Sequence, residues 1–114
     1  MRRSFLSLAV LLVACAHSPA SENACTGVGR SFHALASNKD LGLSMVDQVR
    51  MIRESNEPSS PEAERYLRGM LSIIYQHPDL GAEEIRNAFL EACTTDSEGR
   101  IRLPPAWDPW RHAA

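Results

Sequence analysis

The sequence lacks a dense basic patch, a run long enough to span a membrane, and any useful length of strand-type alternation. Its formal net charge of −2 becomes −4 once Arg2 and Arg3 are set aside. Binding to nucleic acids depends on clustered Lys and Arg side chains, so this balance argues against a nucleic-acid partner. The apolar run Phe5–Val13 is shorter than the about 20 residues that cross a bilayer. The sequence therefore favours a small helical protein.

No group of residues has the spacing of a catalytic or metal-binding site. His, Cys and carboxylate residues do not recur at the intervals typical of zinc or calcium ligands. His33 lies eight residues after Cys25, so a Cys–His nucleophile pair is conceivable, although an exported cysteine is more often in a disulfide. We expect no enzymatic activity, no metal ion and no cofactor.

The N-terminus has the layout of a secretory signal peptide. Arg2 and Arg3 precede the short apolar run Phe5–Val13, and Pro19, with neighbouring small polar residues, follows it. Positive charge before a short apolar stretch is the usual arrangement of an export signal, and it holds the start of the chain on the cytoplasmic side. We therefore expect the chain to be exported.

The end of this run, Leu12-Val13-Ala14-Cys15, resembles the lipobox of bacterial lipoproteins. The resemblance implies a signal peptide over residues 1–14, cleavage just before Cys15, and a diacylglyceryl group on the Cys15 thiol. Small residues also fit ordinary signal cleavage after position 16 or 20, and these sites are the alternatives.

Lipidation of Cys15 would attach the chain to a membrane, because two or more acyl chains bind firmly. Residues 15–23 are expected to form a flexible tether. By the sorting rule of bacterial lipoproteins, Ala16 implies the periplasmic face of the outer membrane. A soluble periplasmic or secreted protein is the alternative. The expected partners are the membrane, through the lipid, and another envelope protein.

The three cysteines divide into one for lipid and two for a disulfide. With Cys15 lipidated, Cys25 and Cys93 remain in an oxidising compartment, where disulfides persist. A Cys25–Cys93 bridge would contribute roughly 4 kcal/mol by the chain-entropy model. Two free buried thiols or a pair of metal ligands are the alternatives.

Residues 24–95 are predicted to form an all-α domain, a small four-helix bundle pinned by this disulfide. Apolar residues recur at helical spacing over about 23–38, 44–53, 60–75 and 81–93. The residues expected on the four inner faces are Cys25, Val28, Phe32, Leu35 and Ala36; Met45, Val46, Val49 and Ile52; Ala63, Leu67, Met70, Leu71 and Ile74; and Ile85, Ala88, Phe89, Ala92 and Cys93.

Local signals mark the helix ends. Ser44 and Ser60 are good N-caps, and Gly81 is an N-cap with Glu84 at the third helical position. Gly42 suits the turn after the first helix.

Residues 96–114 form a separate C-terminal tail in this prediction. Residues 96–99 have turn composition, and a proline-rich stretch then carries Trp107 and Trp110. The favoured interpretation is a tail that lies over the bundle and covers an apolar seam. The alternative is a partner-binding segment that presents Trp107 and Trp110, since stiff chain with exposed tryptophan is a good ligand.

From Cys25 to Cys93 the chain resembles small exported helical proteins of proteobacteria, with a Gly-x-Ser turn at residues 42–44 and Tyr-Gln-His-Pro at 75–78. Most proteins of this type have no assigned function, and our leading hypothesis is a non-enzymatic envelope lipoprotein that binds or supports another envelope component. Residues 25–27 and 75–78 are also similar to periplasmic immunity proteins that neutralise cell-wall-degrading toxins, and such an inhibitor is the first alternative. A small periplasmic chaperone is the second.

Overall fold

The computed structural model describes residues 23–55 and 60–113, which form a mostly helical domain. The predicted signal peptide, Cys15 and almost all of the tether lie outside the described residues. In chain order the elements are α2 (Ala24–Asp40), α3 (Met45–Glu54), α4 (Pro61–Tyr75), α5 (Ala82–Ala92), β1 (Thr94–Thr95), β2 (Ile101–Arg102), η1 (Pro105–Trp107) and α6 (Pro109–His112). The four longer helices confirm the predicted all-α fold.

The helices begin where the capping residues predict. The Ser44 hydroxyl accepts a hydrogen bond from the Asp47 amide at 3.1 Å, and the Asp47 carboxylate accepts one from the Ser44 amide at 3.3 Å. The Gly81 amide donates to the Glu84 carboxylate at 3.1 Å. Gly42 has a φ of +96°, which an L side chain rarely adopts. These local contacts fix the ends of the helices independently of their packing.

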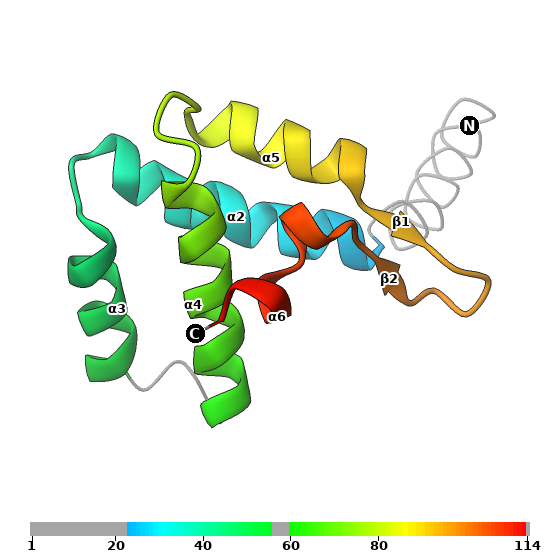
Figure 1. The fold of residues 1–114 in the computed structure, drawn as a ribbon, viewed down its shortest axis with the longest axis horizontal. Helices are drawn as coiled ribbons and strands as arrows, with labels where there is room; N and C mark the ends of the chain where they lie inside the picture. The colour runs from blue at the N-terminus through cyan, green and yellow to red at the C-terminus, as the bar shows by residue number, and fades with distance from the viewer. Residues whose placement is uncertain (1–22, 56–59, 114) are drawn as a thin grey trace, which may run out of the picture.

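Two pairs of helices build the domain (Figure 1). α2 and α5 lie side by side and run in opposite directions, while α4 crosses them and α3 lies at the edge beside α4. Phe32 of α2 and Phe89 of α5 meet in the centre with their rings 4.7 Å apart. The buried apolar residues are Cys25, Phe32, Ala36, Met70, Leu71, Ile73, Ile74, Ala82, Ile85, Phe89 and Cys93. The predicted inner faces of the first, third and fourth helices supply most of them.

One of the predicted inner faces is partly wrong. Val46 was expected inside, but its side chain is 75% exposed, and Gln48 is the α3 residue that is buried. Met45, Val49 and Ile52 are half-buried. The helix is turned so that a polar side chain reaches hydrogen-bond partners in the bundle, which hydrophobic spacing alone does not reveal.

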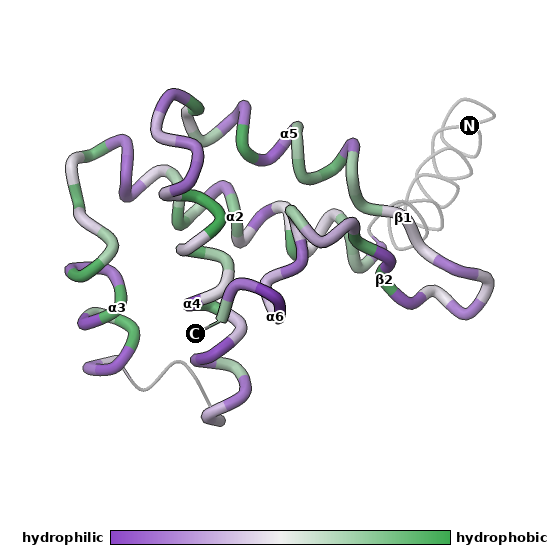
Figure 2. Tube along the Cα trace, in the orientation of Figure 1, coloured by the Kyte–Doolittle hydropathy of each residue, from purple (hydrophilic) through white to green (hydrophobic). Residues whose placement is uncertain are grey.

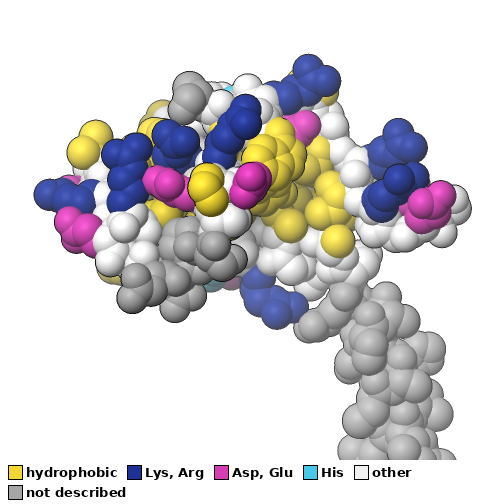
Figure 3. All heavy atoms as spheres, turned by 90° about the horizontal axis from the view of Figure 1, so that it is seen from below, with side chains coloured by type: hydrophobic (Ala, Val, Ile, Leu, Met, Phe, Trp, Pro, Cys, Tyr) yellow, Lys and Arg dark blue, Asp and Glu magenta, His cyan; other side chains and the backbone are white. Residues whose placement is uncertain are grey.

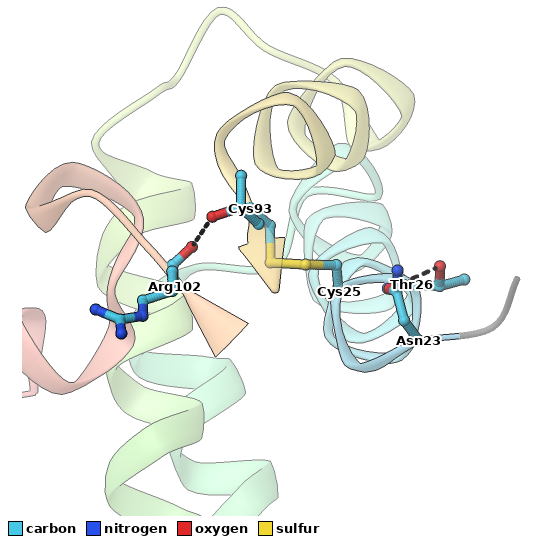
Figure 4. Close-up of a disulfide and its surroundings, with 6 residues drawn as sticks. Asn23, Cys25, Thr26, Cys93 and Arg102 are labelled. Atoms are coloured by element: carbon cyan, nitrogen blue, oxygen red, sulfur yellow. Dashed lines mark hydrogen bonds between the residues drawn. A yellow bond between two sulfur atoms is a disulfide. The ribbon is translucent and has the colours of Figure 1, made fainter. Parts of the chain in front are cut away.

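A disulfide joins Cys25 and Cys93 at one end of the domain (Figure 4). Cys25 lies in the first turn of α2 and Cys93 directly follows α5, with their Cα atoms 5.9 Å apart. The bridge confirms the predicted pairing and fastens the beginning of α2 to the end of α5.

The C-terminal tail packs on the bundle instead of extending from it. A short hairpin pairs Thr94 with Arg102, and the chain then returns across α4. Trp107 contacts Phe32 and Phe89 edge-on, at ring distances of 5.9 and 6.4 Å. Trp107 therefore contributes to the core, as the covering interpretation predicts.

The tail meets α4 most closely at Gly69. Pro109 is buried there, and a Cβ atom added to Gly69 would lie 1.9 Å from the Pro109 carbonyl oxygen. Only glycine allows the backbone of α6 to approach α4 this closely.

Candidate functional site

The described histidines and cysteines are all engaged in structural contacts. Cys25 is in the disulfide, so it cannot serve as a nucleophile beside His33. His33 pairs with Glu83 at 3.2 Å at the surface, and His77 stacks on Trp107 with the ring centroids 5.3 Å apart. Across residues 23–55 and 60–113, no cluster of three His, Cys, Asp or Glu residues could hold a metal ion.

Within residues 23–55 and 60–113, the most exposed large apolar side chains lie on α3 and on the turn before it. Leu41 is 81% exposed, Val46 75% and Met51 50%. Exposed apolar residues occur singly on most proteins, and here Leu41 precedes α3 while Val46 and Met51, five residues apart, point to different sides of the helix. We call this group, Leu41, Val46 and Met51, the α3 surface; Figure 2 shows α3 alternating between hydrophobic and hydrophilic positions.

Two hollows flank α3. The larger one, about 660 Å³, is mainly apolar, and its described lining residues are Met45, Val46, Val49, Arg50, Arg53 and Glu54. The smaller one, about 240 Å³, lies between α2 and α3 and is lined by Leu35, Asn38, Gln48, Met51, Ile52 and Ser55. The apolar side chains of α3 therefore border open space on both sides of the helix.

Hydrogen bonds around Gln48 hold α3 in this position. The Gln48 side-chain amide donates to the Leu35 carbonyl at 3.0 Å and to the Tyr75 hydroxyl at 2.9 Å. Its oxygen accepts from the Asn38 amide group at 3.1 Å, and the Tyr75 hydroxyl donates to the Leu43 carbonyl. A satisfied polar network thus orients α3 and leaves its apolar side chains available for a partner.

Two arginines border the larger hollow. Arg50 pairs with Asp47, and Arg53 pairs with Glu64 at 3.0 Å, while both arginine side chains remain about 60% exposed. Hydrogen bonds from the Ser44 side chain and backbone, and then the charge of Arg50, hold the pKa of Asp47 below its usual value. The edge of this hollow therefore carries charges of both signs, because Arg50 and Arg53 are paired with carboxylates and Glu54 also lines it.

A second, smaller surface lies between α4 and the tail. Trp110 is 47% exposed, and its ring lies 5.0 Å from Tyr66 and 6.0 Å from the Arg65 guanidinium. Burial, and then the charge of Asp108, raises the pKa of Tyr66. A hollow of about 210 Å³ opens beside these residues, and Figure 3 shows hydrophobic side chains gathered on this face between the hairpin and the helices.

The structure brings some of the predicted site residues together and keeps others apart. Cys25 and Cys93 come together, whereas Cys15 lies outside the described residues. Trp107 is partly buried against the core and Trp110 is exposed at 47%, so a partner-binding role for the two tryptophans stays a prediction. Sequence reasoning missed the α3 surface, and the available signal was a polar Gln48 inside an otherwise apolar stripe.

Comparison with known proteins gives no matching family model, curated protein or solved structure. None of the helices within the described ranges is both long and apolar enough to cross a bilayer.

Proposed function

We propose that this chain is a lipid-anchored protein of the bacterial envelope, whose small helical domain binds another envelope component without catalysing a reaction. The observation that carries the proposal is the pairing of the cysteines. Cys25 and Cys93 bond to each other, so Cys15, in the lipobox pattern, is the cysteine outside the disulfide. A disulfide also favours an oxidising compartment such as the periplasm. Ala16, directly after Cys15, favours the outer membrane.

The binding role is supported by the exposed α3 surface and the apolar hollow beside it. Apolar surface of this kind is unfavourable in water and becomes favourable when a partner covers it. The histidines of the described domain and its cysteine pair serve packing, ion pairing and the disulfide, which fits a binding module better than an enzyme.

Metabolic labelling with an alkyne-tagged fatty acid tests the anchor. The full-length chain, expressed in a bacterium with a lipoprotein pathway, is expected to incorporate the label, and Cys15→Ser is expected to lose it. The matched control is the double variant Cys25→Ser with Cys93→Ser, which should still be labelled. An unlabelled wild-type chain whose mature N-terminus follows position 16 or 20 would contradict lipidation.

A further inference from the structure

We infer that the hollow between α4 and the C-terminal tail binds one neutral sugar ring of an envelope glycan, with the ring lying on Trp110 and its hydroxyl groups bonded to Tyr66 and Asp108. This inference rests on the proposed binding function and names the chemistry of the bound component. The hollow lies where α4, the hairpin and α6 meet (Figure 1), and its described lining residues are Tyr66, Ile101, Leu103, Asp108 and Trp110.

The hollow has the size and the mixed lining of a site for one small ring. Its volume is about 210 Å³, below the about 300–1,000 Å³ of sites that enclose a drug-sized ligand. Ile101 and Leu103 supply half-buried apolar side chains, and Trp110 is exposed beside them. Ligand sites combine such an apolar lining with a few polar groups that fix the orientation of the ligand. The hollow therefore has room for one sugar unit of a longer chain.

Trp110 and Tyr66 supply the aromatic surface of the hollow. Their ring centroids are 5.0 Å apart and their planes are inclined by 59°, so the two rings form a corner instead of a parallel stack. The face of an aromatic ring carries partial negative charge, and the C–H groups on one face of a sugar ring carry partial positive charge. A sugar ring can therefore lie flat on one aromatic ring while its edge meets the other.

Polar groups at the hollow have unused hydrogen-bonding capacity. Within the described ranges, neither the Tyr66 hydroxyl nor the Trp110 indole N–H has a hydrogen-bond partner. Asp108 Oδ1 accepts a hydrogen bond from the Trp110 backbone amide at 3.1 Å, while Oδ2 is 3.8 Å from Arg111 Nε, beyond hydrogen-bond distance. A carboxylate has about four acceptor positions, so Asp108 can accept further hydrogen bonds. Sugar hydroxyl groups, which both donate and accept, fit these three polar groups.

Charges of both signs border the hollow and therefore favour a neutral ligand. The Arg65 guanidinium lies 6.0 Å from the Trp110 ring centroid, and the exposed Arg111 lies beside Asp108. A cation on Trp110 would be repelled by these arginines, and an anion would be repelled by Asp108. A neutral ring with hydroxyl groups meets neither repulsion, and the glycans of a bacterial envelope offer such rings.

Heteronuclear NMR of the full-length chain, in a detergent without a sugar headgroup, tests the inference. The chain has two tryptophans, so one indole N–H signal reports on the hollow and the other on the core. The probes are a trisaccharide of N-acetylglucosamine and the core oligosaccharide of lipopolysaccharide. With at least one probe, the Trp110 signal should shift and saturate, while the signal of Trp107, which contacts Phe32 and Phe89, should stay in place. A response to the first probe assigns the glycan to the cell wall, and a response to the second assigns it to the outer leaflet.

Substitutions separate sugar binding from folding, with affinity measured by calorimetry. Trp110→Ala should weaken binding of the sugar at least about tenfold. Tyr66→Phe removes only a hydroxyl that has no partner within the described domain, and it should weaken binding about fivefold. Val46→Ala, on α3 and outside the hollow, is the matched control and should bind as the wild type does. An unchanged Trp107 signal in each variant shows that the tail remains folded.

Several outcomes would overturn the inference. These are no shift of the Trp110 signal with either probe, an equal shift with sorbitol, which has no ring, wild-type affinity in both Trp110→Ala and Tyr66→Phe, or saturable binding of choline instead of sugar.

The fatty-acid label on Cys15, measured for the same chain, distinguishes this inference from the proposed function. A labelled chain that binds no sugar would refute the inference and leave the envelope function standing. An unlabelled chain that binds sugar would refute the lipid anchor and leave the inference standing.

Discussion

At the scale of single residues, Gly69 is where the structure leaves the least space. A Cβ atom there would meet three backbone atoms of Pro109, the nearest at 1.9 Å. Backbone atoms cannot turn aside as the end of a flexible side chain can. The size of this one residue therefore decides whether the tail can lie on α4.

We expect Gly69→Ala to destabilise the protein by at least about 1–3 kcal/mol, because α6 must move away from α4. The free energy of unfolding, measured in urea, checks this. Gly27→Ala is the matched control, since nothing lies within 4 Å of its added Cβ atom. The free energy of unfolding of this control should rise by about 0.5–1 kcal/mol, because alanine has a higher helix propensity than glycine. If Gly69→Ala raised the free energy of unfolding as much as Gly27→Ala does, the close contact between Gly69 and Pro109 would be contradicted.

Gln48 is a second residue whose structural role cannot be inferred from its residue type. Gln48→Ala would remove the hydrogen bonds that its buried side chain makes with the Asn38 amide group, the Leu35 carbonyl and the Tyr75 hydroxyl. We expect a loss of about 2–3 kcal/mol, since unmade hydrogen bonds of buried groups are costly. The exposed Gln76 is the control, and Gln76→Ala should change stability by less than about 0.5 kcal/mol.

At the scale of elements, α3 differs from the other long helices. Its one buried side chain is polar, whereas α2, α4 and α5 each bury several apolar residues. Helices with few buried apolar contacts open locally at a lower free energy. We therefore expect the amides of α3 to exchange with deuterium faster than those of α5, and comparable exchange rates in both helices would be evidence against this weak attachment.

The start of α3 should also respond to acid. The Ser44 hydrogen bonds lower the folded-state pKa of Asp47 from its ordinary value of 3.8. A lowered folded-state pKa gives stabilisation that is present above the ordinary value and is lost as the pH falls through the folded-state value. The difference in stability between the wild type and Asp47→Asn should therefore be full above about pH 5 and shrink below about pH 4.

Urea unfolding at several pH values measures this difference. Hydrogen bonds from the Arg100 and Glu98 amides similarly lower the pKa of Asp96 in the hairpin. The effect of Asp47→Asn on the free energy of unfolding is therefore measured both in the wild type and in a protein that already carries Asp96→Asn. If this effect is independent of pH in both proteins, the proposed link between Asp47 and acid stability is wrong.

At the scale of the whole molecule, the disulfide closes the segment that holds the four longer helices into one loop. Its cysteines are 68 residues apart, so the bridge restricts the unfolded chain strongly. We expect reduction to lower the free energy of unfolding by about 2–5 kcal/mol, as measured by denaturation with and without a thiol reductant. The double variant Cys25→Ala with Cys93→Ala should not respond to the reductant. If the reductant left the free energy of unfolding of the wild type unchanged, this role of the disulfide would be contradicted.

The sequence by itself determined the features that depend on neighbouring residues. Ser44 and Gly81 mark helix starts, and Gly42 marks a turn, because their hydrogen bonds and dihedral angles are local. Helical spacing also placed Cys25 and Cys93 on inward faces, which agrees with the disulfide predicted once Cys15 is assigned to the lipid.

Only the tertiary structure decided which way α3 faces and where the tail lies. Val46 and Gln48 exchange their expected places because Gln48 finds partners on α2 and α4, which are distant in the sequence. The fit of Pro109 on Gly69 likewise depends on two segments forty residues apart. Such contacts follow from how the elements pack, and local periodicity does not contain that information. The α3 surface, and with it the candidate site, therefore became visible only in the folded domain.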